Sequence, residues 1–326
     1  MTHALTEAVR RRKNDVLYVL ATVALACVRP WPRTWVVRAG AFLGAVAWVI
    51  LPGARRTAFA NHRRVFPDVP EAERRRFLRR VYTSLGRTLG ETVALLGGPR
   101  GASAASPPRP RFPWAPGSAA ILERARAKGR GVVFVSAHLG PWEHVASSLV
   151  AHGVPLTALA RESYDPRFTR LTQDFRAALA VPVIHRGERF AAHRMLRVLR
   201  SGGVLGIPMD LRSRVPSVRV PFLGVEADTP VGPARLALRT GATIVVGTLA
   251  EDASGALVLE VTEVHGGAGK TPVRSDAAAI AVTAAINAEL SRRILALPEQ
   301  WVWMHPRFEG SPSTPGHESL HRPSFA

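Results

Sequence analysis

The chain alternates between short apolar runs and longer amphipathic segments over most of its length. Apolar runs at 132–135, 155–160, 182–185, 204–208, 218–224, 243–249 and 257–264 have strand length, and residues 165–179, 188–200, 230–239 and 276–297 have helical periodicity. The helix over 230–239 is expected to begin at a Thr229 cap and to end at Gly241. Strands alternating with helices predict an α/β fold, a largely parallel or mixed sheet covered by helices on both faces.

The N-terminal part follows a different pattern. Residues 16–28 and 39–51 are almost continuously apolar, and each run is shorter than the roughly 20 residues of a membrane-crossing helix. Basic residues flank both runs, and tryptophans lie beside them at Trp31, Trp35 and Trp48. We expect a membrane-associated helical region, either a hairpin dipping into the bilayer or one tilted span, in preference to two buried core helices. A secretory or lipoprotein signal ending near Cys27 fits less well.

These patterns divide the chain into five predicted regions. Between the anchor and the α/β part, two helices broken at 66–70 are rich in arginine, and a Pro- and Gly-rich stretch follows them. The regions are a membrane anchor at 1–54, a basic helical region at 55–96, a linker at 97–117, a catalytic domain at 118–309 and a flexible tail at 310–326.

Composition restricts the partners. The net charge of +20 calls for an anionic surface or an acidic partner. No zinc-finger, RNP-like or basic-zipper pattern is present, so we expect no nucleic acid as partner. Residues 269–271 imitate the end of a phosphate-binding loop without its first glycine, there is no G-x-S-x-G motif, and no histidine or cysteine set has metal spacing. We expect neither a metal nor a cofactor.

The stretch GVVFVSAHLGPWE at 131–143 carries the strongest chemical signal. A buried strand ends at His138, Gly140 permits a tight turn, and Glu143 falls in the first turn of the next helix. Across such a corner a histidine and a carboxylate can meet as a general base and its orienting partner. Arg161 and Asp210 leave two further strands, which predicts a site at one rim of the sheet.

Three blocks in this order resemble the bacterial lipid A biosynthesis (lauroyl/myristoyl) acyltransferases, within the lysophospholipid acyltransferase group that carries the H-x-x-x-x-D/E signature. The blocks are SAHLGPWE at 136–143, the region at 220–242, and PEQWVWMHPRF at 298–308, and the resemblance extends from about Arg38 to Phe308. It implies that Arg161, Arg176 and Arg186 engage phosphate or the acyl donor. Asp210 matches a family aspartate, although Leu211 follows it where the family usually has glutamine.

The resemblance implies transfer of a fatty acyl chain from acyl carrier protein thioester to a hydroxyl of a lipid A precursor. His138 would be the general base, Glu143 would fix its tautomer, and backbone N–H groups near Gly140 would stabilise the oxyanion. The basic clusters from Arg74 to Arg80 and around Arg161 would attract the acidic carrier protein. The implied location is the cytoplasmic side of the cell inner membrane. The alternatives are acylation of another glycolipid or a lysophospholipid, or an inactive lipid-binding membrane protein.

Overall fold

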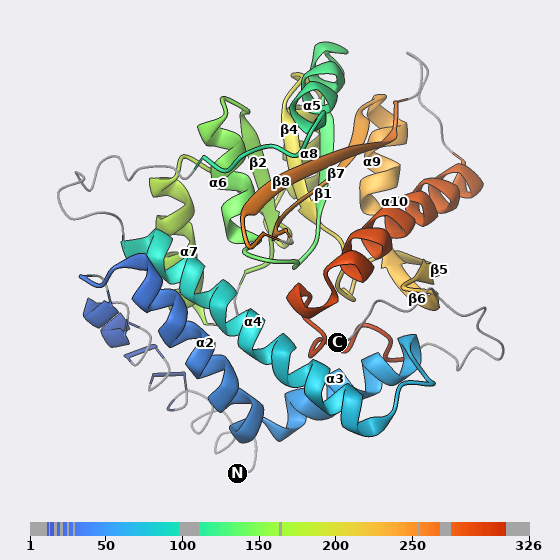
Figure 1. Cartoon of the computed structure of the whole chain (residues 1–326). Coiled ribbons are helices and arrows are strands. Elements are labelled where there is room, and N and C mark those ends of the chain that lie inside the picture. Colours follow the sequence, from blue (N-terminus) through green and yellow to red (C-terminus); the bar gives the residue numbers. More distant parts are fainter. Residues whose placement is uncertain are drawn as a thin grey trace, which may run out of the picture.

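The protein is built around a six-stranded sheet with helices on both faces (Figure 1). This computed structural model describes residues 12, 14–15, 18–19, 22–24, 26–28, 30–97, 111–162, 165–252, 254–267 and 275–310. The strand order is β3-β2-β4-β1-β7-β8, parallel throughout except for β8, which runs antiparallel to β7. The strands are β1 (Val132–Ser136), β2 (Leu156–Ala160), β3 (Val183–His185), β4 (Val204–Pro208), β7 (Thr243–Glu251) and β8 (Leu257–His265).

Two apolar layers separate the sheet from its helices. On one face Phe134 packs with Leu122 and Leu149, and on the other face Val135 packs with residues that include Leu199 and Ile286. The covering helices are α5 (Ser118–Ala127), α6 (Glu143–Ala151) and α7 (Pro166–Ala178) on the first face, and α8 (Ala191–Arg200), α9 (Gly232–Thr240) and α10 (Asp276–Ala296) on the second. The α/β fold predicted from the sequence is confirmed.

One predicted boundary is wrong. The sequence predicts a helix capped by Thr229, but residues 225–230 form β6 (Val225–Pro230), which pairs with β5 (Ser217–Phe222) as a separate antiparallel hairpin. The hydroxyl of Thr229 instead accepts a hydrogen bond from Arg307 at 2.8 Å. The helix α9 therefore begins only at Gly232, and it ends at Gly241 in the left-handed conformation, as expected.

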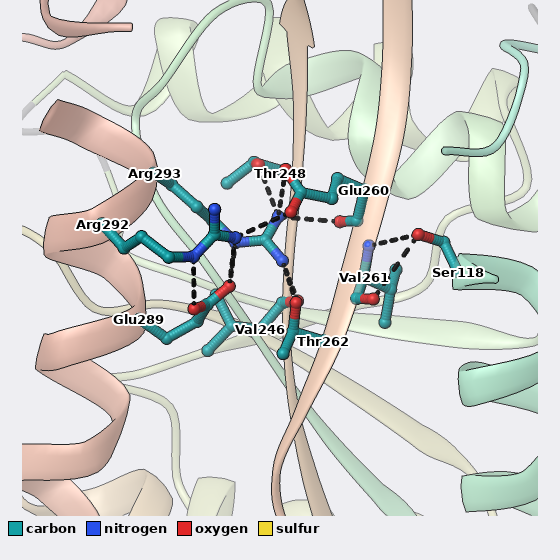
Figure 2. A network of polar contacts seen from close by, with 9 residues as sticks. All are labelled: Ser118, Val246, Thr248, Glu260, Val261, Thr262, Glu289, Arg292 and Arg293. Atoms are coloured by element: carbon teal, nitrogen blue, oxygen red, sulfur yellow. Dashed lines mark hydrogen bonds and ion pairs between the residues drawn. The ribbon is translucent and has the colours of Figure 1, made fainter. Parts of the chain in front are cut away.

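A buried arginine joins α10 to the edge of the sheet (Figure 2). Arg293 donates hydrogen bonds to the hydroxyls of Thr248 and Thr262 and to the carbonyl of Val246, and its charge is matched by Glu289 at 2.8 Å. A buried guanidinium is tolerated only when its donors are satisfied in this way. The network holds α10 across β7 and β8.

Three further helices form a layer below the sheet (Figure 1). They are α2 (Arg33–Ile50), α3 (Pro52–Val65) and α4 (Glu71–Gly97), and the predicted break at 66–70 lies between α3 and α4. The far side of α4 packs on the short 3-10 helix η1 (Pro298–Gln300) and on Trp303 through Phe77. The layer is therefore attached to the body that carries the sheet.

The contact between α2 and α4 depends on glycines. A Cβ atom on Gly40 would lie 2.3 Å from the carbonyl oxygen of Gly86, one on Gly44 would lie 2.1 Å from the carbonyl oxygen of Tyr82, and one on Gly86 would lie 2.2 Å from the carbonyl oxygen of Gly40. The two backbones approach so closely because each helix presents glycines one turn apart. No side chain fits between them.

We expect Gly86→Ala to destabilise the protein by about 1–3 kcal/mol, since the added methyl forces α2 away from α4. Thermal or denaturant unfolding measures this change. Gly53→Ala is the matched control, because a Cβ on Gly53 meets nothing within 4 Å and it also replaces a helical glycine by alanine. Equal stability of the two variants would contradict the close contact.

Several sequence predictions fall wholly or largely outside the described residues. These are most of the apolar run at 16–28, the linker at 97–117 apart from residue 97 and residues 111–117, and the tail beyond residue 310. The second apolar run, at 39–51, lies almost entirely within α2, whose helix starts six residues earlier than that run. The division of the chain into five regions stays a prediction.

Candidate active site

The corner after β1 places His138 at the carboxyl rim of the sheet. The strand ends at Ser136, residues 137–142 turn, and α6 begins at Glu143. Gly140 has a φ of +58°, and a Cβ there would lie 2.5 Å from the carbonyl oxygen of Leu249. The turn therefore requires glycine for its conformation and for its packing.

Asp210 is the hydrogen-bond partner of His138. The register pairs Ser136 with Pro208, so the residues two positions beyond each strand, His138 and Asp210, also face one another. Oδ1 of Asp210 lies 2.9 Å from Nδ1 of His138, and Oδ2 accepts hydrogen bonds from the His138 backbone N–H and from Nε1 of Trp301 at 2.8 Å. A carboxylate held by two donors orients the imidazole, and it leaves Nε2 as the ring nitrogen available to the pocket described below.

The charges of His138 and Asp210 shift the pKa values of both groups in the direction opposite to the effect of burial. Burial lowers the pKa of His138, but the charge and hydrogen bond of Asp210 outweigh it, so the pKa is raised above its ordinary value. Burial likewise raises the pKa of Asp210, whose side chain is fully buried, and His138 and Trp301 reverse this and lower it. Asp210 is thus a buried carboxylate that stabilises a proton on His138.

Glu143 was expected to orient His138, and the structure contradicts this pairing. Its carboxylate faces the guanidinium of Arg176 in the last turn of α7, with Nη2 of Arg176 2.8 Å from Oε1 and Nε 3.3 Å from Oε2. The helix α6 directs Glu143 away from the His138 ring nitrogen that Asp210 already occupies. Glu143 acts on His138 only through its charge, which adds to the raised pKa of the imidazole.

Two further expectations need correction. The backbone N–H of Gly140, expected near an oxyanion, already donates to the carbonyl of Gln300 at 3.1 Å. Asp210, expected to bind substrate, has no exposed surface, and its carboxylate is hydrogen-bonded to His138 and Trp301. Both residues therefore support the corner instead of meeting a ligand.

A pocket of about 700 Å³ opens beside His138. It reaches both faces of the sheet, because its wall combines side chains from the two apolar layers. Phe134, Val145 and Leu156 line it on the α6 face, and Met195 and Leu236 line it on the α8 and α9 face. Apolar space therefore extends on either side of the histidine.

Arginines surround this apolar space. Arg161, Arg176 and Arg186 all line the pocket, as the sequence predicts that they share one site, and Arg212 and Arg235 join them without having been predicted. The added pair comes from the loop after β4 and from α9. The carboxyl end of β4 signalled Arg212, whereas only the fold could bring α9 to this rim.

His305 also lines the pocket. Its Nδ1 is buried with no hydrogen-bond partner among the described residues. Burial lowers the pKa of His305; the charge of Asp210 opposes this effect, and the positive charges of His138, Arg307 and Arg212 add to it. The pocket is thus lined by two imidazoles whose pKa values are shifted in opposite directions, that of His138 upwards and that of His305 downwards.

Among the described residues, no three histidine, cysteine, aspartate or glutamate side chains gather as metal ligands do. The fold and the pocket define an α/β protein with a histidine and aspartate pair at the carboxyl ends of its strands, where enzymes of this architecture bind their ligands.

Residues 10–309 match the family described as bacterial lipid A biosynthesis acyltransferase. The chain belongs to this family, and the resemblance seen in the sequence is confirmed. It is also similar to phosphatidylinositol mannoside acyltransferases of two strains of Mycobacterium tuberculosis, each 32% identical over 126 residues, which are 38% of this chain and 40% of each relative. The aligned part thus spans less than half the length of these relatives.

Proposed function

We propose that the protein transfers a fatty acyl group from a thioester to a hydroxyl of a phosphorylated glycolipid, with His138 as general base. The observation that carries this proposal is that His138, held from behind by the buried Asp210, lies on the wall of an apolar pocket surrounded by arginines. Family membership supports acyl transfer as the reaction.

The proposed chemistry begins at Nε2 of His138. This nitrogen takes the proton of the acceptor hydroxyl as the oxygen attacks the thioester carbonyl, and Asp210 stabilises the imidazolium that forms. The tetrahedral intermediate then collapses, the carbon–sulfur bond breaks, and the leaving thiolate takes the proton from Nε2. The single cysteine, Cys27, does not line the pocket, so the proposed route uses no acyl-cysteine intermediate and transfers the acyl group directly.

The walls of the pocket support an acyl chain and a phosphate as ligand parts. The apolar side chains beside His138 suit a methylene chain, which contributes about 0.8 kcal/mol for each CH₂ removed from water. The guanidinium groups of Arg161, Arg186 and their neighbours suit phosphate, because a planar fork of N–H donors matches its oxygens. Arg176, held by Glu143, has a fixed orientation at this rim.

Two acceptors are proposed for the hydroxyl. A lipid A precursor follows from the family, and a phosphatidylinositol mannoside follows from the aligned relatives. Incubation of the purified chain with labelled acyl carrier protein and with each acceptor separates the two by the product formed. Product from neither acceptor, nor from a lysophospholipid, would favour a protein that binds lipid without acylating it.

We propose acyl carrier protein as the donor, and the structure narrows the surface that could attract it. Arg74 does not belong to this surface: its side chain is 2% exposed and donates hydrogen bonds to the carbonyls of Phe66 and Val69. Arg80 pairs with Glu299, whereas Arg75 and Arg76 are exposed. On α4, the proposed carrier-protein surface is therefore limited to the exposed arginines.

We expect Arg75→Glu with Arg76→Glu to raise KM for acyl carrier protein thioester and to leave kcat unchanged, since the charges attract the acidic donor without touching the pocket. The effect should weaken with salt. Arg239→Glu is the control, because Arg239 is exposed near the end of α9, at the rim opposite the pocket. Equal or better use of acyl-coenzyme A, with no response to these reversals, would contradict the carrier-protein donor.

The family is membrane-associated, and we propose the cytoplasmic side of the cell inner membrane as the location. Acyl carrier protein thioesters are cytoplasmic, so the donor places the pocket on that side. Fractionation of cells that express the full chain, followed by protease treatment of intact spheroplasts, tests this location.

A further inference from the structure

The outer face of α2 is apolar and exposed. Five side chains form it, and each has more than half of its surface exposed: Trp35 61%, Phe42 69%, Leu43 56%, Val49 68% and Ile50 64%. Positions 35, 42 and 49 recur every seven residues, with 43 and 50 one residue later, so they share one side of the helix. Large apolar side chains gathered on one face indicate a contact surface.

The opposite face of α2 is held against α4. Gly40 and Gly44 lie on the buried side, with Val36 and Trp48, and meet the backbone of α4 directly. At one end Arg33 forms a two-point ion pair with Glu91, whose side chain is 6% exposed. The helix α2 is therefore fixed along the body of the protein and presents only its outer face.

This attachment decides how a bilayer could meet α2. By length and composition Arg33–Ile50 could cross a membrane, but its 18 residues extend only about 27 Å as a helix, less than the roughly 30 Å of hydrocarbon. Crossing would also carry the partner α4 into the bilayer, together with its Arg80–Glu299 and Arg87–Glu251 pairs. Charged groups at that depth are costly, so the fold opposes a span.

Charge and aromatic residues identify the occupant. Residues 33–97 contain twelve arginines against four acidic residues, which favours an anionic surface. Arg38 is exposed four residues before Phe42, and Arg56 is exposed in α3 just beyond Ile50. Trp31 and Trp35 are exposed at the N-terminal end of α2, and tryptophan prefers the boundary between headgroups and acyl chains.

We propose that the outer face of α2 inserts into the headgroup–acyl boundary of an anionic bilayer with the helix axis in the membrane plane, so that α2 docks the protein without crossing. The same layer reaches the site, because α4 packs on η1, and Leu139 beside His138 pairs with Trp301 directly after η1. The docked face and the His138 corner are thus joined through a continuous series of packed elements.

Vesicle binding of the full chain tests the docking. We expect Phe42→Asp with Val49→Asp to lower partition onto phosphatidylcholine–phosphatidylglycerol vesicles at least about tenfold, since two apolar side chains lose their burial in lipid. Wild type should bind vesicles of phosphatidylcholine alone more weakly. Ile280→Asp is the matched control, because Ile280 is an exposed apolar residue of another helix, α10. Unchanged circular dichroism shows that the double variant is folded.

Labelling distinguishes the plane from a span. Cys27, exposed before α2, is the single cysteine, and Gly53→Cys in a Cys27→Ser background marks the other end. With protein bound to the outside of sealed vesicles, an impermeant maleimide should label both positions. Protection of one end only would show a span and overturn the proposal, as would equal vesicle binding by wild type and double variant. Loss of a dimer in the double variant, with vesicle binding intact, would assign the face to a second copy. None of these readouts requires transfer activity.

Discussion

Replacing His138 with alanine is expected to lower kcat for acyl transfer by about 10² to 10⁴, the usual contribution of general-base catalysis. The hydroxyl of an acceptor is a weak nucleophile until a base takes its proton, and Nε2 of His138 is the basic nitrogen that Asp210 leaves available in the pocket. Steady-state kinetics with the acceptor that the wild type uses measures the loss.

A second variant separates catalysis from folding. His138→Ala leaves the buried carboxylate of Asp210 without one donor, whereas His138→Asn keeps an N–H group that can reach it and lacks a base. Both variants should show the same decrease in kcat. The unfolding temperature of His138→Asn should be nearer to that of the wild type. Turnover by His138→Asn close to that of the wild type would remove His138 from the mechanism.

Asp210→Asn is expected to lower kcat by about 10² to 10⁴ with little change in KM, because Asp210 acts on His138 and not on the substrate. The amide would present N–H to Nδ1 of His138, which then carries its proton on Nε2 and can no longer accept one there. The fully buried position gives the amide no alternative partner in solvent.

The pH profile tests this role of Asp210 separately. The base must be neutral, and Asp210 raises the pKa of His138 above its ordinary value of 6.5, so kcat/KM of the wild type should rise with pH through a pKa above 6.5. In Asp210→Asn the interaction that raises the pKa of His138 is lost while burial remains. The residual activity should therefore still increase with pH, but through a lower pKa than in the wild type. An unchanged pH profile would show that Asp210 does not raise the pKa of His138 and has only a structural role.

Glu143→Gln provides the comparison. It removes a charge from the same rim but leaves the Nδ1 hydrogen bond of His138 in place. We expect a smaller loss of kcat, a smaller shift of the profile to lower pH and a higher KM, because Arg176 loses its ion pair. A larger loss of kcat in Glu143→Gln than in Asp210→Asn would show that Glu143, and not Asp210, is the main functional partner of His138.

Local patterns in the sequence determined the type of most elements and the position of the corner. Strand and helix periodicities arise from neighbouring backbone geometry, so β1, the turn at Gly140 and the start of α6 could be predicted from thirteen residues. The strand β6 was missed because residues 225–230 alternate for only six positions beside a proline-rich helix start.

Long-range pairing decided the partners. His138 and Asp210 are 72 residues apart, and they meet because β4 lies beside β1 in a register that aligns their carboxyl ends. Glu143 is closer in sequence, yet the direction of α6 turns it to Arg176. Sequence spacing determines neither the His138–Asp210 pairing nor the Glu143–Arg176 pairing, since both depend on which strands and helices pack together.

The same division holds for the N-terminal helix. The sequence by itself determined that 39–51 is apolar and that glycines recur at Gly40 and Gly44 and again at Gly86 and Gly90. Only the tertiary structure decided that these glycines face each other, because contact between α2 and α4 requires the whole turn through α3. That contact leaves one apolar face of α2 exposed, and its orientation follows from packing that no local pattern encodes.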